Sequence, residues 1–197
     1  MREIAAPSLA ERTTLRLGGR AIAELVLETH EDALALPGHL ARLGGEPLAI
    51  GRGSNLLAGD GELPLVLVRP ALLTGPEIDG AAGEKVLVRV GAGVPLPRLL
   101  RFCAANGLSG LEGLTGIPGS VGGAVAMNAG SFGVETTNRV ERLTVFSGGR
   151  LVEVEAPALS AGYRSLAIVD AEGQEMSEFL VLEAIFGLTP APKDGIA

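Results

Sequence analysis

Two glycine-rich segments of this 197-residue sequence contain the residue types that bind phosphate groups and flat heteroaromatic rings. The longer segment, residues 114–130, places Gly116, Gly119, Gly122 and Gly123 in an apolar run with a proline and an asparagine. Buried irregular backbone leaves N–H groups without acceptors, and glycine lets several of them converge on one ligand. A phosphate or a flavin-like ring supplies such acceptors. A tight turn between buried strands would explain one Gly-Gly pair, but this density of glycine favours a ligand loop.

The second segment, residues 48–57, is a short apolar strand that runs into Gly51-Arg-Gly-Ser-Asn55. It is not the Rossmann fingerprint, because the third glycine is missing and no amphipathic helix of normal length follows. Consecutive backbone N–H groups beside the short polar side chains of Ser54 and Asn55 suit a pyrophosphate. A lone Gly-x-Gly is usually a turn, whereas two such loops on one chain predict a dinucleotide site.

The elements that position the second loop form a β-α-β unit. Residues 21–28 alternate as a strand, and residues 31–43 carry a helical pattern that ends at Gly44-Gly45. Proline in a helix interior costs about 3 kcal/mol, so Pro37 predicts a kink or a break into two turns. With strands at 47–51 and 65–69, the loop follows the carboxyl end of a strand, where α/β folds commonly place ligands.

A change of composition between residues 69 and 83 predicts a domain boundary or a long connection. The fold class predicted from the whole pattern is α+β, with a small βαβ lobe at residues 1–70 and a larger lobe at 71–197. The elements expected in the larger lobe are a strand at 85–91, a helix from about 95 to Asn106-Gly107, a hairpin of strands 142–147 and 150–155 around a Gly148-Gly149 turn, and a last strand at 178–188.

Composition limits the classes of function. The formal net charge of −7 argues against nonspecific nucleic-acid binding. No apolar run approaches the roughly 20 residues of a membrane helix, and the N-terminus lacks a signal-peptide core. We therefore expect a cytoplasmic protein with no membrane partner. The single cysteine, Cys103, lies in a helical pattern that predicts a buried thiol. His30 and His39 have no neighbouring cysteine or histidine, so no metal site is expected.

Five segments match a known family in order and spacing: residues 13–21, 51–57, 110–124, 128–130 and Tyr163-Arg164. They resemble the UDP-N-acetylenolpyruvoylglucosamine reductases, also called UDP-N-acetylmuramate dehydrogenases, which are FAD enzymes of peptidoglycan precursor synthesis. The resemblance covers nearly the whole chain. It implies a two-lobed FAD-binding fold of the UDP-N-acetylmuramate dehydrogenase and vanillyl-alcohol-oxidase type, with the flavin between the lobes.

The resemblance also implies which residues hold the cofactor. The loop at residues 51–56 would cradle the pyrophosphate and approach the flavin, and residues 117–123 and 128–130 would line the rest of the cofactor. Carried over by position, these residues are Gly51, Arg52, Gly53, Ser54, Asn55 and Leu56, then Ile117, Pro118, Gly119, Ser120, Gly122 and Gly123, and finally Asn128, Ala129 and Gly130. Some relatives in the wider superfamily attach flavin through a histidine or cysteine near the loop at residues 51–56. Since Arg52, Ser54 and Asn55 stand there, noncovalent FAD is expected.

In the family, NADPH reduces the flavin, which then passes hydride to the enolpyruvyl double bond of a UDP-sugar. Arg164 occupies the position of the arginine that stabilises the negative charge developing toward the substrate carboxylate. A guanidinium suits this role because it is always charged and binds a carboxylate in a bidentate manner. Without the resemblance, an ordinary surface ion pair would be the interpretation of Arg164.

The match fails on the substrate side. The family enzymes have a C-terminal third domain that supplies a proton-donating serine and a late glutamate, and neither has a counterpart in this sequence. We therefore expect the third, substrate-binding domain to be absent. The expected spacing after Tyr163-Arg164 is also shortened, because Ser165 follows directly.

Two functional hypotheses stay open on these grounds. The first is an FAD-dependent reductase of this family, with FAD, NADPH and a UDP-sugar as its ligands. The second is a noncatalytic or repurposed FAD-binding module that lost its substrate domain. In the second case a homo-oligomer, or another partner, would cover the open flavin face, because a large exposed apolar cleft is otherwise a liability.

Overall fold

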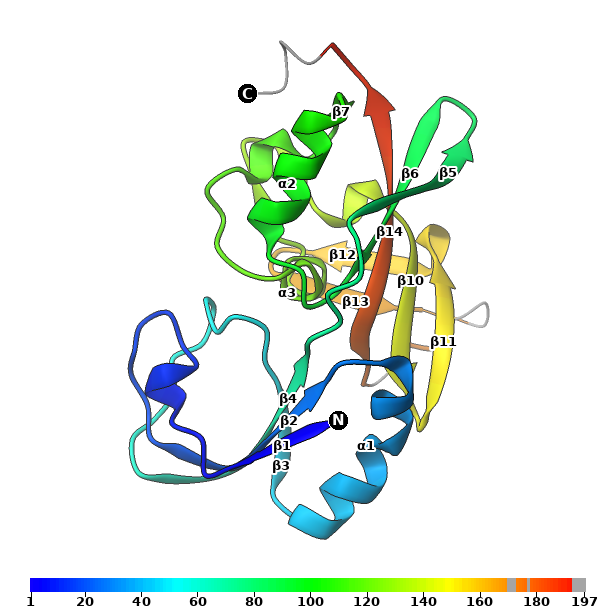
Figure 1. Cartoon of the computed structure of the whole chain (residues 1–197). Coiled ribbons are helices and arrows are strands. Elements are labelled where there is room, and N and C mark those ends of the chain that lie inside the picture. The colour runs from blue at the N-terminus through cyan, green and yellow to red at the C-terminus, as the bar shows by residue number, and fades with distance from the viewer. Residues whose placement is uncertain (170–172, 177, 193–197) are drawn as a thin grey trace.

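The computed structural model describes residues 1–169, 173–176 and 178–192. Two sheets form two lobes, with the N-terminal lobe below and the larger lobe above in Figure 1. The small sheet uses residues 2–70 and the large sheet residues 77–190. The expected α+β class is therefore present. The division into two domains at residue 70 stays a prediction.

The small lobe is a four-stranded sheet in the order β1-β2-β4-β3. Strands β2 and β3 run parallel to β4, whereas β1 runs antiparallel to β2. Helix α1 packs its Ala33 and Leu36 against Leu25 and Leu27 of β2. The elements are β1 (Arg2–Ala5), the 3-10 turn η1 (Leu9–Glu11), β2 (Arg20–Leu27), α1 (His30–Leu43), β3 (Glu46–Ala49) and β4 (Glu62–Pro70).

The large lobe is an antiparallel sheet in the order β11-β10-β14-β6-β5, and β7 also pairs with β14. Its main elements are β5 (Glu77–Ala82), β6 (Lys85–Gly91), α2 (Leu96–Ala105), β7 (Leu108–Ser109), α3 (Val121–Ala126), β10 (Val140–Ser147), β11 (Arg150–Glu155) and β14 (Leu180–Pro190). Between them lie η2 (Glu112–Leu114), β8 (Gly130–Ser131), β9 (Val134–Glu135), η3 (Thr137–Arg139), η4 (Ala156–Ala158), β12 (Leu159–Gly162) and β13 (Ser165–Ile168).

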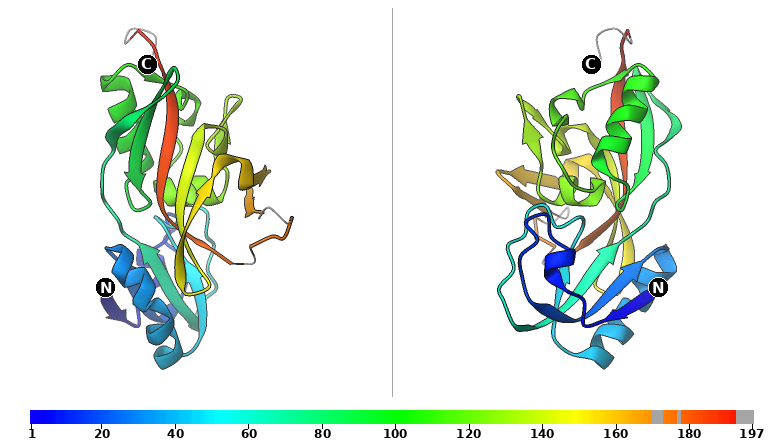
Figure 2. Two further views of the ribbon diagram at one scale, coloured as in Figure 1. Left: turned by 90° about the vertical axis from the view of Figure 1, so that its right-hand side faces the viewer. Right: turned by 60° about the vertical axis from the view of Figure 1, so that its left-hand side comes forward.

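Strand β14 connects the two lobes. Its Phe186 and Leu188 are buried in the core of the large lobe, whereas its Leu182 is buried in the cluster that contains α1 and β2. Figure 2 shows the strand running from the top of the molecule down to the small lobe. One strand is therefore buried in the hydrophobic clusters of both lobes and ties the lobes together.

Most of the expected elements are confirmed, but of the kink or break expected at Pro37 the break is absent. Helix α1 continues through Pro37 without a break. Its N-terminus is fixed by a capping box between Thr29 and Asp32, and the exposed Pro37 leaves the buried face free to pack. Packing of that face offsets the backbone hydrogen bond that proline removes.

Strand β5 lies inside the stretch expected to be a long connection. All of its residues are exposed, so it lacks the alternation of apolar and polar residues by which a strand is recognised. Both glycines of the predicted hairpin turn have positive φ, at +56° for Gly148 and +79° for Gly149, as a type I′ turn requires. Across the described residues, no helix has the length and apolar character needed to cross a membrane.

Candidate functional site

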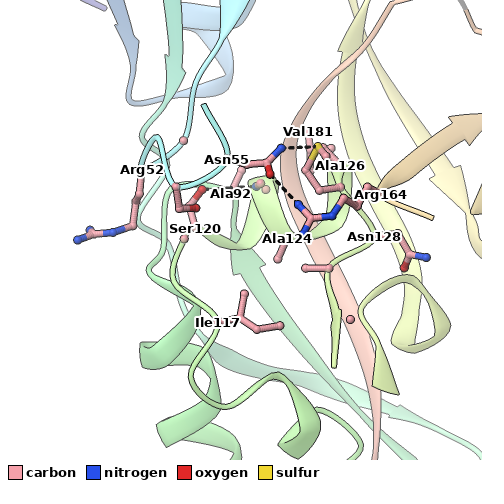
Figure 3. Close-up of a pocket in the computed structure, with 18 of the residues that line it drawn as sticks. Arg52, Asn55, Ala92, Ile117, Ser120, Ala124, Ala126, Asn128, Arg164 and Val181 are labelled. Atoms are coloured by element: carbon pink, nitrogen blue, oxygen red, sulfur yellow. Dashed lines mark hydrogen bonds between the residues drawn. The ribbon is translucent and has the colours of Figure 1, made fainter. Parts of the chain in front are cut away.

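A cavity of about 940 Å³ opens between the two lobes. The two glycine-rich loops come together in its wall (Figure 3). Every residue expected at the site lines this cavity: Gly51, Arg52, Gly53, Ser54, Asn55, Leu56, Ile117, Pro118, Gly119, Ser120, Gly122, Gly123, Asn128, Ala129, Gly130 and Arg164. Segments more than sixty residues apart in the sequence therefore share one hollow, large enough for a dinucleotide.

The small-lobe wall, residues 51–55, offers main-chain donors. In the part of the chain that the structure describes, no residue accepts a hydrogen bond from any N–H of this wall. The side chain of Arg52 points away from the other labelled residues in Figure 3, so this residue contributes its backbone. Backbone N–H groups need acceptors once they are removed from water, and successive ones form an anion-binding concavity.

Gly53 shows why this loop needs glycine. Its φ is +65°, and a Cβ at this position would lie 2.0 Å from the carbonyl oxygen of Arg12. The backbone of residues 12 and 13 packs directly against the loop, and the N–H of Thr14 donates to the Gly53 carbonyl at 3.1 Å. A larger residue would require both a rare backbone conformation and a shift of the adjacent chain.

The large-lobe wall is built from residues 117–123. Gly122 packs so closely on Ala92 that an added Cβ would lie 2.7 Å from the Ala92 Cβ atom. The carbonyl of Gly119 accepts from the N–H of Leu96 at 3.0 Å, which ties the loop to the start of α2. No described residue accepts from the N–H groups of Gly119 and Ser120. This wall therefore adds free N–H donors, and its backbone lies close to the cavity.

The two walls contact each other directly. The Ser54 hydroxyl donates to the carbonyl of Pro118 at 3.2 Å. Across the same seam, a Cβ at Gly51 would lie 2.5 Å from the Ser120 hydroxyl oxygen. These contacts hold the free N–H groups of both loops in one concave surface, which can surround an anion from two sides.

Asn128 lines the cavity, but its side chain is committed to the protein. The amide nitrogen donates to Glu135 at 3.0 Å and to the carbonyl of Gly162 at 3.2 Å. The amide oxygen accepts from the N–H and the hydroxyl of Thr137. In Figure 3 the side chain points away from the centre of the site. Since its hydrogen-bonding capacity is filled, only the main chain of Asn128 is left to face a ligand.

Arg164 stands on the opposite side of the cavity, at the turn between β12 and β13. Its φ is +53°, a left-handed conformation that is unusual for arginine. Its guanidinium donates to the amide oxygen of Asn55 at 2.8 Å, and the amide nitrogen of Asn55 lies 3.8 Å from the Met127 sulfur (Figure 3). The guanidinium also lies 5.8 Å from the ring centre of Tyr163. An always-charged cation thus reaches across the cavity from an exposed turn.

Sequence reasoning missed several residues of the cavity wall. Met127, Glu135, Asn138, Tyr163 and Phe179 also line it. Glu135 is the last residue of β9, in a short hairpin with β8 that carries no recognisable alternation, and Phe179 precedes β14. The signal that could have located Tyr163 is its position next to Arg164. Of the lining residues described, Glu135 is acidic, whereas Arg52 and Arg164 are basic. Because the Arg52 side chain points away from the site, the cation that faces the cavity is Arg164, and the free backbone N–H groups add further donors for an anionic ligand.

Comparison with known proteins gives the chain a family. The model of the FAD binding domain matches residues 23–155, which is more than half of the chain. The chain belongs to the FAD binding domain family. This FAD binding domain has FAD as its cofactor, and the match spans the loop at residues 51–55 and the loop at 117–130.

The resemblance to the UDP-N-acetylenolpyruvoylglucosamine reductases is confirmed. The chain is 52% identical to the protein of that name from Oleidesulfovibrio alaskensis over 173 residues, covering 86% of this chain and 58% of the relative. It is 53% identical to the one from Nitratidesulfovibrio vulgaris, covering 85% of this chain and 57% of the relative. The chain thus spans a little over half the length of these curated relatives.

Solved structures confirm the fold class of the FAD binding domain. A UDP-N-acetylenolpyruvylglucosamine reductase from Thermus caldophilus matches with a TM-score of 0.76 and 32% identity, covering 99% of this chain and 64% of that one. A solvent-stable cholesterol oxidase matches with a TM-score of 0.61 and 17% identity, covering 94% of this chain and 37% of that one. The second match shows a shared fold alone.

Proposed function

We propose that this chain holds FAD noncovalently in the cavity between its lobes and reduces an enolpyruvyl UDP-sugar with electrons from NADPH. The observation that carries the proposal is the set of free backbone N–H groups at residues 51–55, 119 and 120 around one cavity. A pyrophosphate supplies acceptors for such a set, and the apolar backbone wall at residues 117–123 suits a flat ring.

Noncovalent attachment follows from the residues available. The lining residues that the structure describes contain no histidine and no cysteine. Cys103 is buried in α2, and burial together with the nearby charge of Glu112 raises the pKa of its thiol to about 12. A neutral buried thiol is a poor nucleophile. We therefore expect the flavin to be released intact when the protein unfolds.

Arg164 is the residue to which we assign charge stabilisation in the reaction. Bound FAD would supply the hydride for the enolpyruvyl double bond, and negative charge would then develop toward the carboxylate of the sugar's side chain. The guanidinium of Arg164 is permanently charged and is already oriented by Asn55. Preorganised charge of this kind typically contributes a few kcal/mol to the stability of a transition state.

The alternative is an FAD-binding module without turnover, covered by a second copy of the chain or by another protein. Phe132 and Tyr163, each 92% exposed on a short hairpin, favour a covered surface near the cavity. A cytoplasmic location stays a prediction under either function.

Turnover separates these two functions. Protein loaded with FAD is reduced with NADPH, and the enolpyruvyl UDP-sugar is then added while the flavin absorbance is followed. The reductase function predicts that the sugar reoxidises the flavin. Reduction by NADPH without reoxidation by the sugar would instead support the noncatalytic module.

The Arg164→Ala variant tests the assigned role. Loss of one preorganised charge should slow reoxidation by about 100-fold or more, with FAD affinity unchanged. The matched control is Arg98→Ala, which removes an exposed arginine of α2 that does not line the cavity. Reoxidation of the Arg164→Ala protein at the rate of the unmodified protein would show that Arg164 has no such role.

A further inference from the structure

A buried ion cluster lies behind the small-lobe wall. The Glu24 carboxylate, on β2, is only 1% exposed. One of its oxygens accepts from the Nε atom of Arg12 at 2.6 Å, and the other accepts from the Nε atom of Arg69. An isolated carboxylate at this depth would be very costly, and the two guanidinium groups make its burial tolerable. Arg12 also lies 3.5 Å from the exposed Glu11, so the cluster joins two guanidinium groups to two carboxylates beside the loop.

Arg69 also contacts the loop itself. Its Nη1 atom donates to the carbonyl oxygen of Gly51 at 3.1 Å. The peptide between Gly51 and Arg52 is trans, so its carbonyl and its N–H point in opposite directions. Gly51 and Arg52 line the cavity and Arg69 does not. By holding the carbonyl on the protein side, Arg69 turns the N–H of Arg52 toward the cavity.

The peptide between Gly53 and Ser54 is supported by the backbone of residues 12–14 and not by the Arg12 side chain. The segment that carries Arg12 packs against Gly53, and the N–H of Thr14 donates to the Gly53 carbonyl at 3.1 Å. The following N–H, that of Ser54, consequently points away from this segment. The Gly51 carbonyl is thus held by Arg69, which is bound to Glu24. The Gly53 carbonyl is held by the segment of Arg12, whose side chain is bound to the same carboxylate.

We propose that Glu24, acting through Arg69 and Arg12, is a positioning residue that fixes the N–H groups of the 51–55 loop for the phosphates of the cofactor. This inference rests on the proposed function, because it takes the phosphates of FAD as the occupant of the loop. The cluster orients the loop N–H groups before the ligand binds. The ligand therefore does not have to order the loop, which is the general advantage of a preorganised site. It touches no ligand itself.

The test compares FAD with riboflavin, which carries the same ring and no phosphate. In Arg69→Lys, the ammonium keeps a charge beside Glu24 but cannot hold the carboxylate and the Gly51 carbonyl in one planar fork. We expect FAD affinity to fall by about tenfold or more, since hydrogen bonds to charged groups are the strong ones. Riboflavin affinity should stay unchanged. Both are measured by fluorescence titration.

Two further variants guard against a trivial loss of folding. Arg89→Lys is the matched control, because Arg89 pairs with the buried Glu183 at 2.8 Å in the other lobe. It should lower the melting temperature and leave FAD affinity unchanged. The triple variant Arg12→Met, Glu24→Leu and Arg69→Met replaces all three side chains of the cluster, so that no buried charge is left without its partner, and such replacement is often neutral for stability. It should stay folded and lose FAD affinity with riboflavin affinity kept.

Retention of full FAD affinity in Arg69→Lys or in the folded triple variant would overturn the inference. So would an equal fall in FAD and riboflavin affinity, which would indicate general damage to the lobe. Failure of the unmodified protein to bind FAD at all would instead refute the proposed function on which the inference rests.

Discussion

The two sides of the cavity are built differently. The 51–55 wall presents main-chain N–H groups, and a buried ion cluster and a closely packed neighbouring segment support it from behind. The Arg164 side consists of side chains on a short hairpin, where Tyr163 is 92% exposed. Backbone donors held by packing suit a cofactor that stays bound, whereas an exposed arginine suits a substrate that enters and leaves. Changes on the first side should therefore affect cofactor binding and folding, and changes on the second should affect turnover.

The largest effect on the first side is expected for Gly53→Ala. The new Cβ would combine a left-handed backbone with a clash against the Arg12 carbonyl, at a cost of about 3 kcal/mol or more in the free energy of unfolding. Flavin binding should be lost with it. Denaturant unfolding of the purified protein measures the cost.

Gly59→Ala is the matched control for this change. An added Cβ at Gly59 meets nothing within 4 Å, and its φ is not positive. The free energy of unfolding should change by no more than about 0.5 kcal/mol. Equal stability of the two variants would mean that the loop can move away from residues 12 and 13, contrary to the rigid wall described above.

The next effect concerns the anchor of the Arg164 hairpin. Asn128→Ala would leave Glu135, Thr137 and the Gly162 carbonyl without their partner, at a cost of about 2–4 kcal/mol in unfolding free energy. Asn106→Ala removes one hydrogen bond of an exposed side chain to the Phe102 carbonyl and should cost under about 1 kcal/mol. Urea unfolding of both variants compares them. Similar costs would show that Asn128 is not the anchor.

The smallest effect concerns the scaffold behind the large-lobe wall. Because the folded protein raises the Cys103 pKa to about 12, the neutral thiol is favoured in the folded state. The associated stability is complete below pH 9 and is lost as the pH rises toward 12. At pH 8, an aromatic disulfide reagent should label Cys103 far more slowly in the folded protein than in urea. Equally fast labelling would mean that α2 opens readily.

The sequence contained enough information to predict both walls of the cavity. Both walls carry local patterns, at residues 51–55 and 116–123. Closely spaced glycines in these patterns indicate an irregular backbone. Strand β6 and the hairpin of β10 and β11 were predicted for a similar reason, because alternation and a Gly-Gly turn lie within a few residues of one another.

What could not be predicted depends on long-range polar contacts. Glu24 and Arg69 are 45 residues apart, and neither differs in sequence from an ordinary surface residue. Asn128 lies in a ligand-loop motif, yet its side chain accepts a hydrogen bond from Thr137 and donates one to the Gly162 carbonyl. The break expected at Pro37 is wrong because tertiary packing of Ala33 and Leu36 overrides local propensity.

Amide hydrogen exchange with and without FAD tests the central claim most directly, since it reports the N–H groups themselves. The free N–H groups at residues 51–55, 119 and 120 should exchange rapidly alone and slow markedly in both loops at once when FAD is added. The turn at Gly148 and Gly149, far from the cavity in sequence and outside its lining, should not change. Slowing in only one loop, or in neither, would contradict a shared cradle for the flavin's phosphates and ring.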